Sequence, residues 1–344
     1  MTEMQVLTAY FAERRRVHGR FAADAMVDLL EREGVSASIT LRGIAGFGTT
    51  HMLRGDRVLT LSEDPPVTVT AVDSADRIGA LADDVIALTG HGVVTLERAW
   101  PELESLPADT AVRLSMHLGR KQSTAGEPAN VTAGEPAYVA VCDVLRRCGF
   151  VTADVSLGVD GTVARHRRRA RFISRNADVP VLVTGIGTAP QALRAMSELR
   201  AALPDTPISV RPALLCRSDG TTLAHPPATW PLQKLTVHSY EDSRRHGQPL
   251  HRALTAQLRA TGHAGGATAL RSLWGYRGTR PPRGDRFLQL ARRVPVTTVL
   301  VGPAAALAAD RQIIDEVTAE QGIVTCEPVA ALVVVNGDRR LDIE

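Results

Sequence analysis

The chain has 344 residues, of which 44% are hydrophobic and only 4% aromatic, so it is long enough for roughly two or three domains with largely aliphatic cores. This hydrophobic content excludes a disordered chain. The formal net charge of +3 is too small to argue for nucleic acid as a partner.

Cysteine spacing and the lack of long apolar runs point to an intracellular protein. The four cysteines, at positions 142, 148, 216 and 326, form no CxxC pair, which predicts buried free thiols in a reducing compartment. The first stretch, MTEMQVLTAYFAERRR, is too polar for a signal peptide, and no run of about 18 apolar residues occurs. We therefore expect a soluble, cytoplasmic protein.

Apolar periodicity in the first hundred residues predicts an alternation of strands and helices. The expected elements in chain order are a strand at 6–11, a helix through 21–30, a strand from 37 to 41, paired β segments at 58–61 and 67–72, a helix from 73–74 and a strand at 92–97. Ala37, Ile39 and Leu41 alternate with polar residues along the second strand. The order is β-α-β-β-α-β, the ferredoxin-like split βαβ arrangement.

The same pattern recurs twice further along the chain. Pro66, Pro180 and Pro295 each precede a Val and an apolar strand, at spacings of 114 and 115 residues. The octapeptide RGDRVLTL, at 54–61, returns as RGDRFLQL at 283–290. Because these landmarks agree in order and spacing, the repeated segment is a domain and the RGD is no adhesion motif.

We therefore expect an α+β protein of three tandem units, which are named unit 1 (1–105), unit 2 (110–216, the divergent copy) and unit 3 (232–344). Further strands are expected at 112–118, 207–212, 235–240 and 322–327, and second helices from Thr188 and Pro303. A ferredoxin-like unit covers only one face of its sheet with helices. Three open faces that close around a pseudo-threefold axis would bury one another.

Two segments of unit 1 carry a resemblance to a known family. They are LRGIAGFG, at 41–48, and LTLSEDPPVTVTAVD, at 59–73, and the match is good in unit 3 through ALRSLWGYRG and RGDRFLQL. They resemble the bacterial family of domain of unknown function 190, whose members are PII-like. The resemblance implies homotrimers with ligand clefts between subunits, completed by a loop after the second strand. Three copies in one chain then imply an intramolecular pseudo-trimer and a monomeric chain.

Gly-rich turns after the second strand are the candidate ligand-binding segments, because their backbone N–H groups can converge on an anion. The candidate residues are Arg42, Gly43, Gly46, Phe47, Gly48, His51, Arg54 and Arg57 in unit 1, and Arg271, Gly275, Tyr276, Arg277 and Arg286 in unit 3. The alternative is that the glycines only make tight turns, that the arginines are surface charges or ion-pair partners, and that the aromatic rings pack against the loop.

Unit 2 departs from this pattern in its turn, GVDGTVARHRRRAR, at 158–171. Asp160 would repel a phosphate, whereas the basic run 165–171 would attract one. That run is interpreted as a solvated loop or as a site for a small anion. One chain could therefore offer three unequal clefts, which a homotrimer cannot encode.

Enzymatic motifs are missing from the sequence, which has no GxSxG, HExxH or Walker A motif and no GxGxxG after a strand. We therefore expect no catalysis, no cofactor and no metal, although a spatial cluster of histidines stays open as a minority alternative. The resemblance implies a regulatory protein that binds ATP, ADP, AMP or a cyclic nucleotide and modulates a membrane transporter or a fluoride channel. The alternative is a ligand-free scaffold that recognises a protein through its loops.

Overall fold

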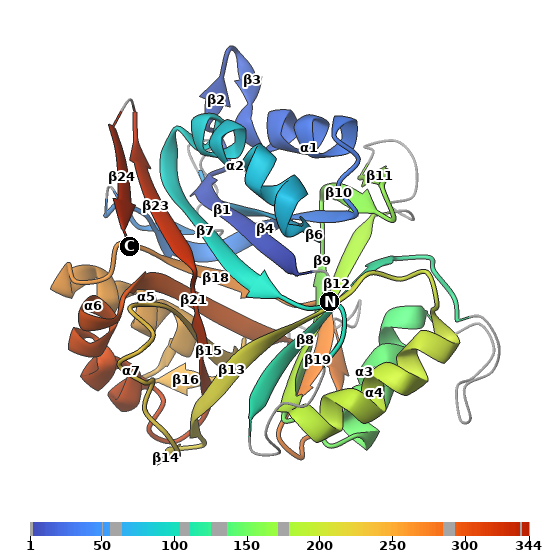
Figure 1. Cartoon of the computed structure of the whole chain (residues 1–344). Helices are drawn as coiled ribbons and strands as arrows, with labels where there is room; N and C mark the ends of the chain where they lie inside the picture. The colour runs from blue at the N-terminus through green and yellow to red at the C-terminus, as the bar shows by residue number, and fades with distance from the viewer. Residues whose placement is uncertain are drawn as a thin grey trace.

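The computed structural model describes residues 3–49, 51–55, 64–103, 110–124, 136–170, 179–284, 293–337 and 339–343. Within these ranges the chain forms seven helices, a large antiparallel sheet system and two separate short hairpins. Three groups of helices lie on the outside of the molecule and the strands lie between them (Figure 1). The protein is therefore a mixed α and β structure in which each unit contributes one helix group.

Unit 1 has the predicted order of elements. They are β1 (Met4–Ala12), α1 (Ala22–Arg32), β4 (Ala37–Phe47), β6 (Pro66–Ser74), α2 (Ala75–Thr89) and β7 (His91–Ala99). The strand order across the antiparallel sheet is β7-β1-β6-β4, which is the connectivity of a split βαβ unit. Both helices pack on one face, where Leu7 and Val69 of the sheet share a core with Met26 of α1 and Ile78 of α2.

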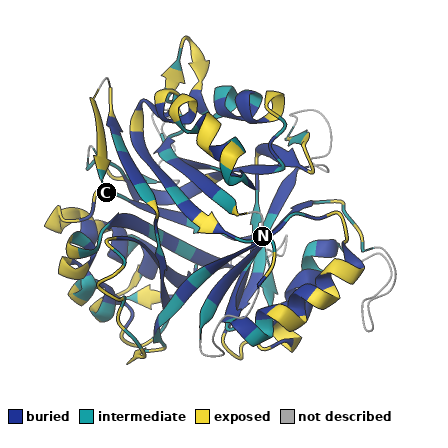
Figure 2. Ribbon diagram, in the orientation of Figure 1, coloured by how far each residue is buried: buried dark blue, intermediate teal, exposed yellow. Residues whose placement is uncertain are grey.

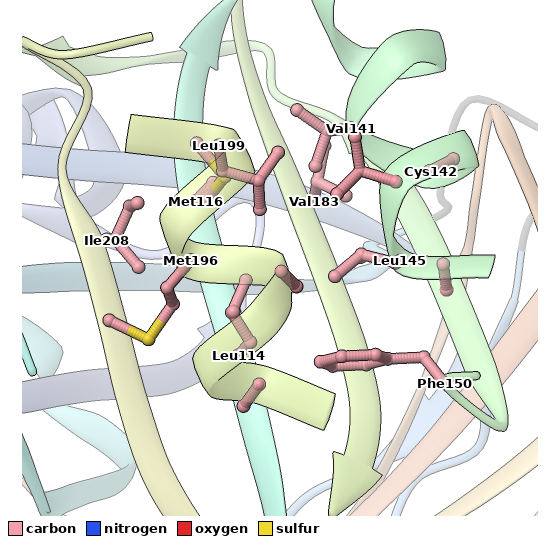
Figure 3. Close-up of a cluster of buried hydrophobic side chains, with 14 of the residues drawn as sticks. Leu114, Met116, Val141, Cys142, Leu145, Phe150, Val183, Met196, Leu199 and Ile208 are labelled. Carbon is pink, nitrogen blue, oxygen red and sulfur yellow. The ribbon is translucent and has the colours of Figure 1, made fainter. Parts of the chain in front are cut away.

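Unit 2 repeats this connectivity around its own core. Its elements are β8 (Ala111–Gly119), α3 (Ala137–Arg147), β9 (Thr152–Leu157), β10 (Asp160–Val163), β11 (His166–Arg169), β12 (Pro180–Thr188), α4 (Ala189–Ala202) and β13 (Ile208–Ser218). Leu114, Met116 and Val183 of the strands pack against Leu145 of α3 and Leu199 of α4 (Figure 3). Each is almost fully buried, which stabilises the fold by about 1.5–3 kcal/mol per side chain.

Unit 3 differs from the prediction in its second helix. Its elements are β15 (Leu232–Tyr240), α5 (Leu250–Thr261), β18 (Ala267–Arg271), β19 (Trp274–Arg277), β21 (Pro295–Pro303), α6 (Ala304–Ala309), α7 (Arg311–Val317) and β22 (Ile323–Pro328). The expected single helix is divided at Asp310, which is fully buried. Its carboxylate accepts a hydrogen bond of 2.8 Å from the Thr261 hydroxyl, which ties the break to the end of α5.

Several short strands were not predicted. The hairpins β2–β3 (Arg16–Val17, Arg20–Phe21) and β16–β17 (Arg244–Arg245, Gln248–Pro249) turn at His18-Gly19 and His246-Gly247, all four residues with positive φ. A Gly after a polar residue between short β segments is a usual hairpin signal, so the sequence does contain it. Strands β5 (Arg54–Gly55), β14 (Thr221–Thr222) and β20 (Arg283–Gly284) were not predicted either. The expected strand at 58–61 lies outside the described residues.

The second strand of each unit also pairs with the second strand of another unit. β4 pairs with β18, β10 pairs with β4, and β19 pairs with β9, so every unit pairs with both others. A glycine makes each close approach possible. A Cβ at Gly46, Gly161 or Gly275 would lie 2.4, 2.2 or 2.1 Å from a carbonyl oxygen of the facing strand, so only Gly is accommodated without a shift.

The last strand of each unit reaches the last strand of another unit. Trp100 forms a bridge with Val210 of β13, and the end of β13 pairs with β22. After β22 the chain adds a terminal hairpin, β23 (Ala331–Asn336) and β24 (Arg339–Ile343), and β23 pairs with β7 of unit 1. The predicted unit 3 ended its strands at 327, so this hairpin is an addition to the predicted pattern.

Strand β4 is buried on both faces, although alternation at 37–41 is by itself typical of a half-buried strand. The polar residues Ser38 and Thr40 are 0% and 2% exposed. Ser38 shares a hydrogen bond of 2.9 Å with Thr162 of unit 2, and Figure 2 shows the inner strands as largely buried. The polar positions therefore face a neighbouring unit rather than solvent.

Candidate functional site

A cavity of about 570 Å³ lies between units 1 and 3. Unit 1 contributes the end of β1, the turn after β4 and the start of β7, and unit 3 contributes the start of β18 and the middle of β21. The lining includes Tyr10, Ala12, Arg14, Arg15, Arg16, Phe47, Gly48, Arg54, Asp64, His91, Gly265, Gly266, Val299 and Val301. A volume in this range suits a small-molecule ligand.

Backbone rather than side chain forms part of the cavity wall. A Cβ at Gly48 or at Gly265 would meet nothing within 4 Å, so both residues face open space. At Gly266 a Cβ would lie 3.0 Å from the carbonyl oxygen of Phe47, because the pairing of β4 with β18 brings the two turns together. Bare backbone from both units therefore lies within reach of a ligand.

An aspartate occupies the polar side of the cavity. The Asp64 carboxylate accepts a hydrogen bond of 2.6 Å from the backbone N–H of Arg14, and its second oxygen accepts one from the Arg54 guanidinium. Arg54 also donates to the Asp64 carbonyl oxygen at 3.1 Å. The Arg54 and Asp64 side chains are 21% and 25% exposed, so their pairing is only partly screened by solvent.

The other arginines of the cavity rest against unit 1. Arg16 stacks over the Phe21 ring at 4.2 Å and donates to the Gly19 carbonyl oxygen at 2.9 Å. The Arg15 guanidinium packs against Gly90, at the end of α2, where a Cβ would collide with it. These contacts hold the basic rim in place around the cavity.

At the equivalent boundary of units 2 and 1, a side chain takes up the space that Ala12 leaves free in unit 1. Gly119 takes the position of Ala12, since both pair with the proline that opens the third main strand of their unit. The Arg168 guanidinium lies 2.7 Å from the position of a Cβ on Gly119 and takes up that space. Arg168 belongs to the basic run that was expected to attract an external anion. Its own guanidinium lies in the place where we expected such an anion.

Carboxylates of the protein neutralise the neighbouring arginines of unit 2. Arg167 binds Asp160 at 2.7 Å and also binds Asp28 of α1, and Arg169 binds Asp24 of α1 at 2.8 Å. The interpretation of the described part of this run as a solvated loop is wrong, because it forms β11 and docks on α1. Asp160 serves as the ion-pair partner of these arginines.

The equivalent cleft between units 3 and 2 is much smaller, with a cavity of about 60 Å³ that Tyr240 and Arg277 help to line. Tyr240 takes the position of Ala12, and its hydroxyl accepts a hydrogen bond of 3.0 Å from the Arg277 backbone N–H. The Arg277 side chain, 6% exposed, binds Asp154 of unit 2. Burial alone would raise the pKa of Asp154, but the Arg277 guanidinium and His238 hold it well below its usual range. Burial lowers the pKa of His238 to about 4.

The structure brings only part of the predicted unit 1 site to the cavity. Phe47, Gly48 and Arg54 line it. His51 stacks on the Phe47 ring with 5.8 Å between centroids. Arg42 instead pairs with Glu13 at 2.9 Å, away from the lining residues. Gly43 and Gly46 serve the close packing of β4 against Pro66 and β18, and Arg57 lies outside the described residues.

Most of the predicted unit 3 residues serve contacts between units, whereas Arg271 forms an ion pair within its own unit. Arg271 binds Glu241 at 2.7 Å, and Gly275 allows the pairing of β19 with β9. Tyr276 is fully buried in the core of unit 2 and donates a hydrogen bond of 3.2 Å to the Phe150 carbonyl oxygen. Together with the buried Arg277 described above, they line no part of the large cavity, and Arg286 lies outside the described residues.

Several residues of the cavity were not predicted. Their signals in the sequence are modest: three consecutive arginines, Arg14 to Arg16, directly follow a strand, and Gly265-Gly266 precede one. Asp64 carries no local signal, because its role depends on Arg54 and on the end of β1.

A second group of buried charges lies where the three units meet, and it is called the central charge cluster. Its members are Glu97, Arg113, Arg211, Lys234 and Glu327, each at most 9% exposed. Arg113 binds Glu327 at 2.7 Å, Arg211 binds Glu97 at 2.7 Å, and Lys234 contacts both carboxylates. Burial lowers the pKa of Lys234, whereas the three cations hold the pKa of Glu327 well below its usual range against the effect of burial.

The described residues contain neither a candidate metal centre nor a candidate membrane-spanning helix. No three His, Cys, Asp or Glu side chains in the described ranges gather so that they could hold a metal ion. No helix in the same ranges is long and apolar enough to cross a membrane.

Comparison with known proteins finds similarity in all three units. The model of the family described as "Uncharacterized ACR" (DUF190) matches residues 4–100, 112–213 and 232–331. The "UPF0166 protein MJ1524" of Methanocaldococcus jannaschii is 26% identical over 98 residues, which cover 28% of this chain and 90% of that protein. A solved structure of an unknown protein from Galdieria sulphuraria aligns with 62% of this chain and 99% of its own length. The two chains are 12% identical, and the TM-score is only 0.19.

Proposed function

Because this chain belongs to the family of domain of unknown function 190, whose model matches each of its three units, we propose that it is a PII-like regulatory protein that acts without catalysis. It binds a small anionic effector in the cavity between units 1 and 3, and an adenine nucleotide is the first candidate. Binding changes the surface that the chain offers to a partner such as a membrane transporter or channel.

The proposal treats the three ferredoxin-like units as an intramolecular pseudo-trimer that replaces three separate subunits. Its support is the double set of strand pairs between units, one through the second strands and one through the last strands. If the ring is closed within one chain, light scattering gives a mass near 36.9 kDa. A mass near three chains would contradict the pseudo-trimer.

The observation that carries the function is a difference in cavity size between equivalent boundaries of the described units: about 570 Å³ between units 1 and 3, against about 60 Å³ between units 3 and 2. Ala12 leaves space at the unit 1 and unit 3 boundary, whereas Arg168 takes up the space over Gly119 and Tyr240 narrows its own cleft. A chain that needed only a scaffold would gain stability by filling all three. A cavity of ligand size at the boundary of units 1 and 3 supports a dedicated ligand.

The chemistry of the cavity favours a ligand with an anionic end and an apolar end. Arg54, the Arg14 backbone N–H and the bare backbone of Gly48 suit an oxyanion. Val299 and Val301 of β21 offer an apolar surface on the unit 3 side. A nucleotide joins a phosphate to a flat base and fits both requirements.

Calorimetry with ATP, ADP, AMP and cyclic nucleotides tests the proposal. Arg54→Ala should weaken binding by roughly tenfold or more, because a charge-assisted hydrogen bond to the ligand is lost. Arg42→Ala is the matched control: Arg42 is an arginine of the same turn region but pairs with Glu13 outside the cavity, so binding should not change. Absence of heat with every nucleotide would sink the nucleotide proposal.

The second candidate is a module that recognises a protein directly. Met52 and Leu53, next to the cavity-lining Arg54, are 61% and 46% exposed. Adjacent exposed apolar side chains of this size suit a protein contact. Under this alternative Met52→Ser with Leu53→Ser weakens capture of the partner while no nucleotide binds.

A further inference from the structure

We propose that the Asp64 carboxylate occupies the place in the cavity where the anionic group of the ligand binds. The ligand must displace it, and the cavity therefore selects a phosphate over a carboxylate. The inference rests on the proposed function, because it concerns the same cavity. It adds a specificity-determining residue and narrows the ligand to compounds that carry a phosphoryl group.

The contacts of Asp64 are those of a bound anion. One carboxylate oxygen accepts the Arg14 backbone N–H at 2.6 Å, and the other accepts the Arg54 guanidinium. All three residues line the cavity. A backbone N–H next to a guanidinium is a usual pair of donors for an external oxyanion, so the carboxylate occupies the place such an anion would take.

Competition from a tethered carboxylate sets a threshold for the ligand. Asp64 belongs to the same chain as its donors, so its effective concentration at the subsite is high, on the order of millimolar or above. A carboxylate ligand would only exchange one singly charged anion for another, so the donors would attract it no more strongly than they attract Asp64. A phosphoryl group brings a charge of about −1.5 to −2 and three acceptor oxygens, so it can gain from the exchange.

A different role for Asp64 predicts the opposite effect. If the carboxylate only positions Arg54 for the ligand, then its removal leaves Arg54 less ordered and binding weakens. If it competes with the ligand, then its removal frees both donors and binding strengthens. The sign of the change therefore separates the two roles.

Asp64→Asn in the full chain provides the test, because it removes the charge and keeps the shape. Calorimetry compares adenosine, AMP and adenosine 5′-carboxylic acid, and a thermal shift assay uses pyrophosphate. We expect AMP to bind about tenfold more tightly to the variant, from loss of a like charge near its phosphate. The affinity for the carboxylate analogue should rise most from the native chain to the variant, and the affinity for adenosine should not change.

Glu13→Gln is the matched control, because Glu13 is one residue from Arg14 but pairs with Arg42 outside the cavity. It should leave all affinities unchanged, and Asp64→Ala repeats the test if the Asn variant unfolds. Weaker binding of AMP to both Asp64 variants would overturn the inference and leave the proposed function standing. If nucleotides fail to bind but pyrophosphate stabilises Asp64→Asn more than the native chain, the subsite stands and the nucleotide proposal falls. If no probe binds either protein, both are overturned.

Discussion

Arg113 and Arg211 lie directly opposite each other on the neighbouring strands β8 and β13, and each binds a carboxylate from another unit. Arg113 reaches Glu327 of unit 3, and Arg211 reaches Glu97 of unit 1, both at 2.7 Å. Two like charges at facing positions of a sheet are destabilising unless they are compensated. The two facing arginines of unit 2 are therefore stable only where the neighbouring units supply carboxylates to bind them.

Removal of one carboxylate from the central charge cluster should be costly. Glu97→Gln leaves three buried cations with one buried anion, and we expect the free energy of unfolding to fall by about 3–5 kcal/mol. Urea denaturation measures it. The double variant with Lys234→Met should cost less than the single one, because it also removes a cation that Glu97 binds.

Asp83→Asn is the control for this prediction, because Asp83 pairs with Arg340 at the surface with 83% of its side chain exposed. Its effect should stay within about 0.5 kcal/mol. Equal effects of the buried and the surface substitution would contradict the role of the cluster.

Buried histidines should make the protein less stable in mild acid. Burial lowers the pKa of His117, and likewise that of His238, from 6.5 to about 4. Between these values the unfolded chain binds more protons than the folded one, so stability falls as pH falls from about 6.5 to 4. The loss is about 3 kcal/mol for each histidine.

Denaturation at a series of pH values measures this slope. His117→Gln should flatten it by about one proton, because it removes one of these two buried imidazoles. A slope that the His117 variant does not alter would show that other groups cause the acid sensitivity.

The glycines of the facing second strands should tolerate no side chain. At Gly161 φ is 151°, and a Cβ would lie 2.2 Å from the Ser38 carbonyl oxygen. Gly161→Ala should therefore lower the free energy of unfolding by about 1–3 kcal/mol or more. Gly79→Ala, in the exposed middle of α2 with nothing near its Cβ position, should instead raise it by about 0.5–1 kcal/mol. Similar effects at both sites would contradict the close strand approach.

Periodicity and repeats were sufficient to predict the order of the main elements, because each unit carries its own apolar pattern. The strand at 6–11 appears as β1, and the second helix from Thr188 appears as α4 with Thr188 as its capping residue. The break at Asp310 was missed, since it depends on a hydrogen bond to Thr261 of another helix.

The candidate site was harder to predict, because the same turn serves different purposes in the three units. Phe47 and Tyr276 occupy equivalent positions, yet Phe47 lines the cavity and Tyr276 is enclosed in the core of unit 2. Gly48 is bare backbone at the cavity, whereas its counterpart Arg277 is a buried ion-pair partner. Side chains of the neighbouring unit decide whether the turn lines a cavity or is buried. A local motif in one unit carries no information about those side chains.

Ala12→Tyr should close the remaining cavity. Tyr240 narrows the equivalent cleft, where its hydroxyl accepts a hydrogen bond from the backbone N–H of Arg277, and Gly48 is the counterpart of Arg277 in unit 1. A tyrosine at position 12 can reach this turn and occupy the space that the proposed ligand needs. Calorimetry should then show loss of nucleotide binding, while the circular dichroism spectrum stays native.

Ala12→Ser is the matched control, because it changes polarity at the same position without filling the cavity. It should keep nucleotide binding within a few fold of the native value, since one small surface substitution changes a free energy by about 0.5 kcal/mol or less. Binding of a nucleotide to the tyrosine variant with native affinity would place the ligand elsewhere. Ala12 lies at the boundary of units 1 and 3 and is not part of the central charge cluster. If the tyrosine variant loses nucleotide binding but keeps its stability, ligand recognition is separate from the assembly of the three units.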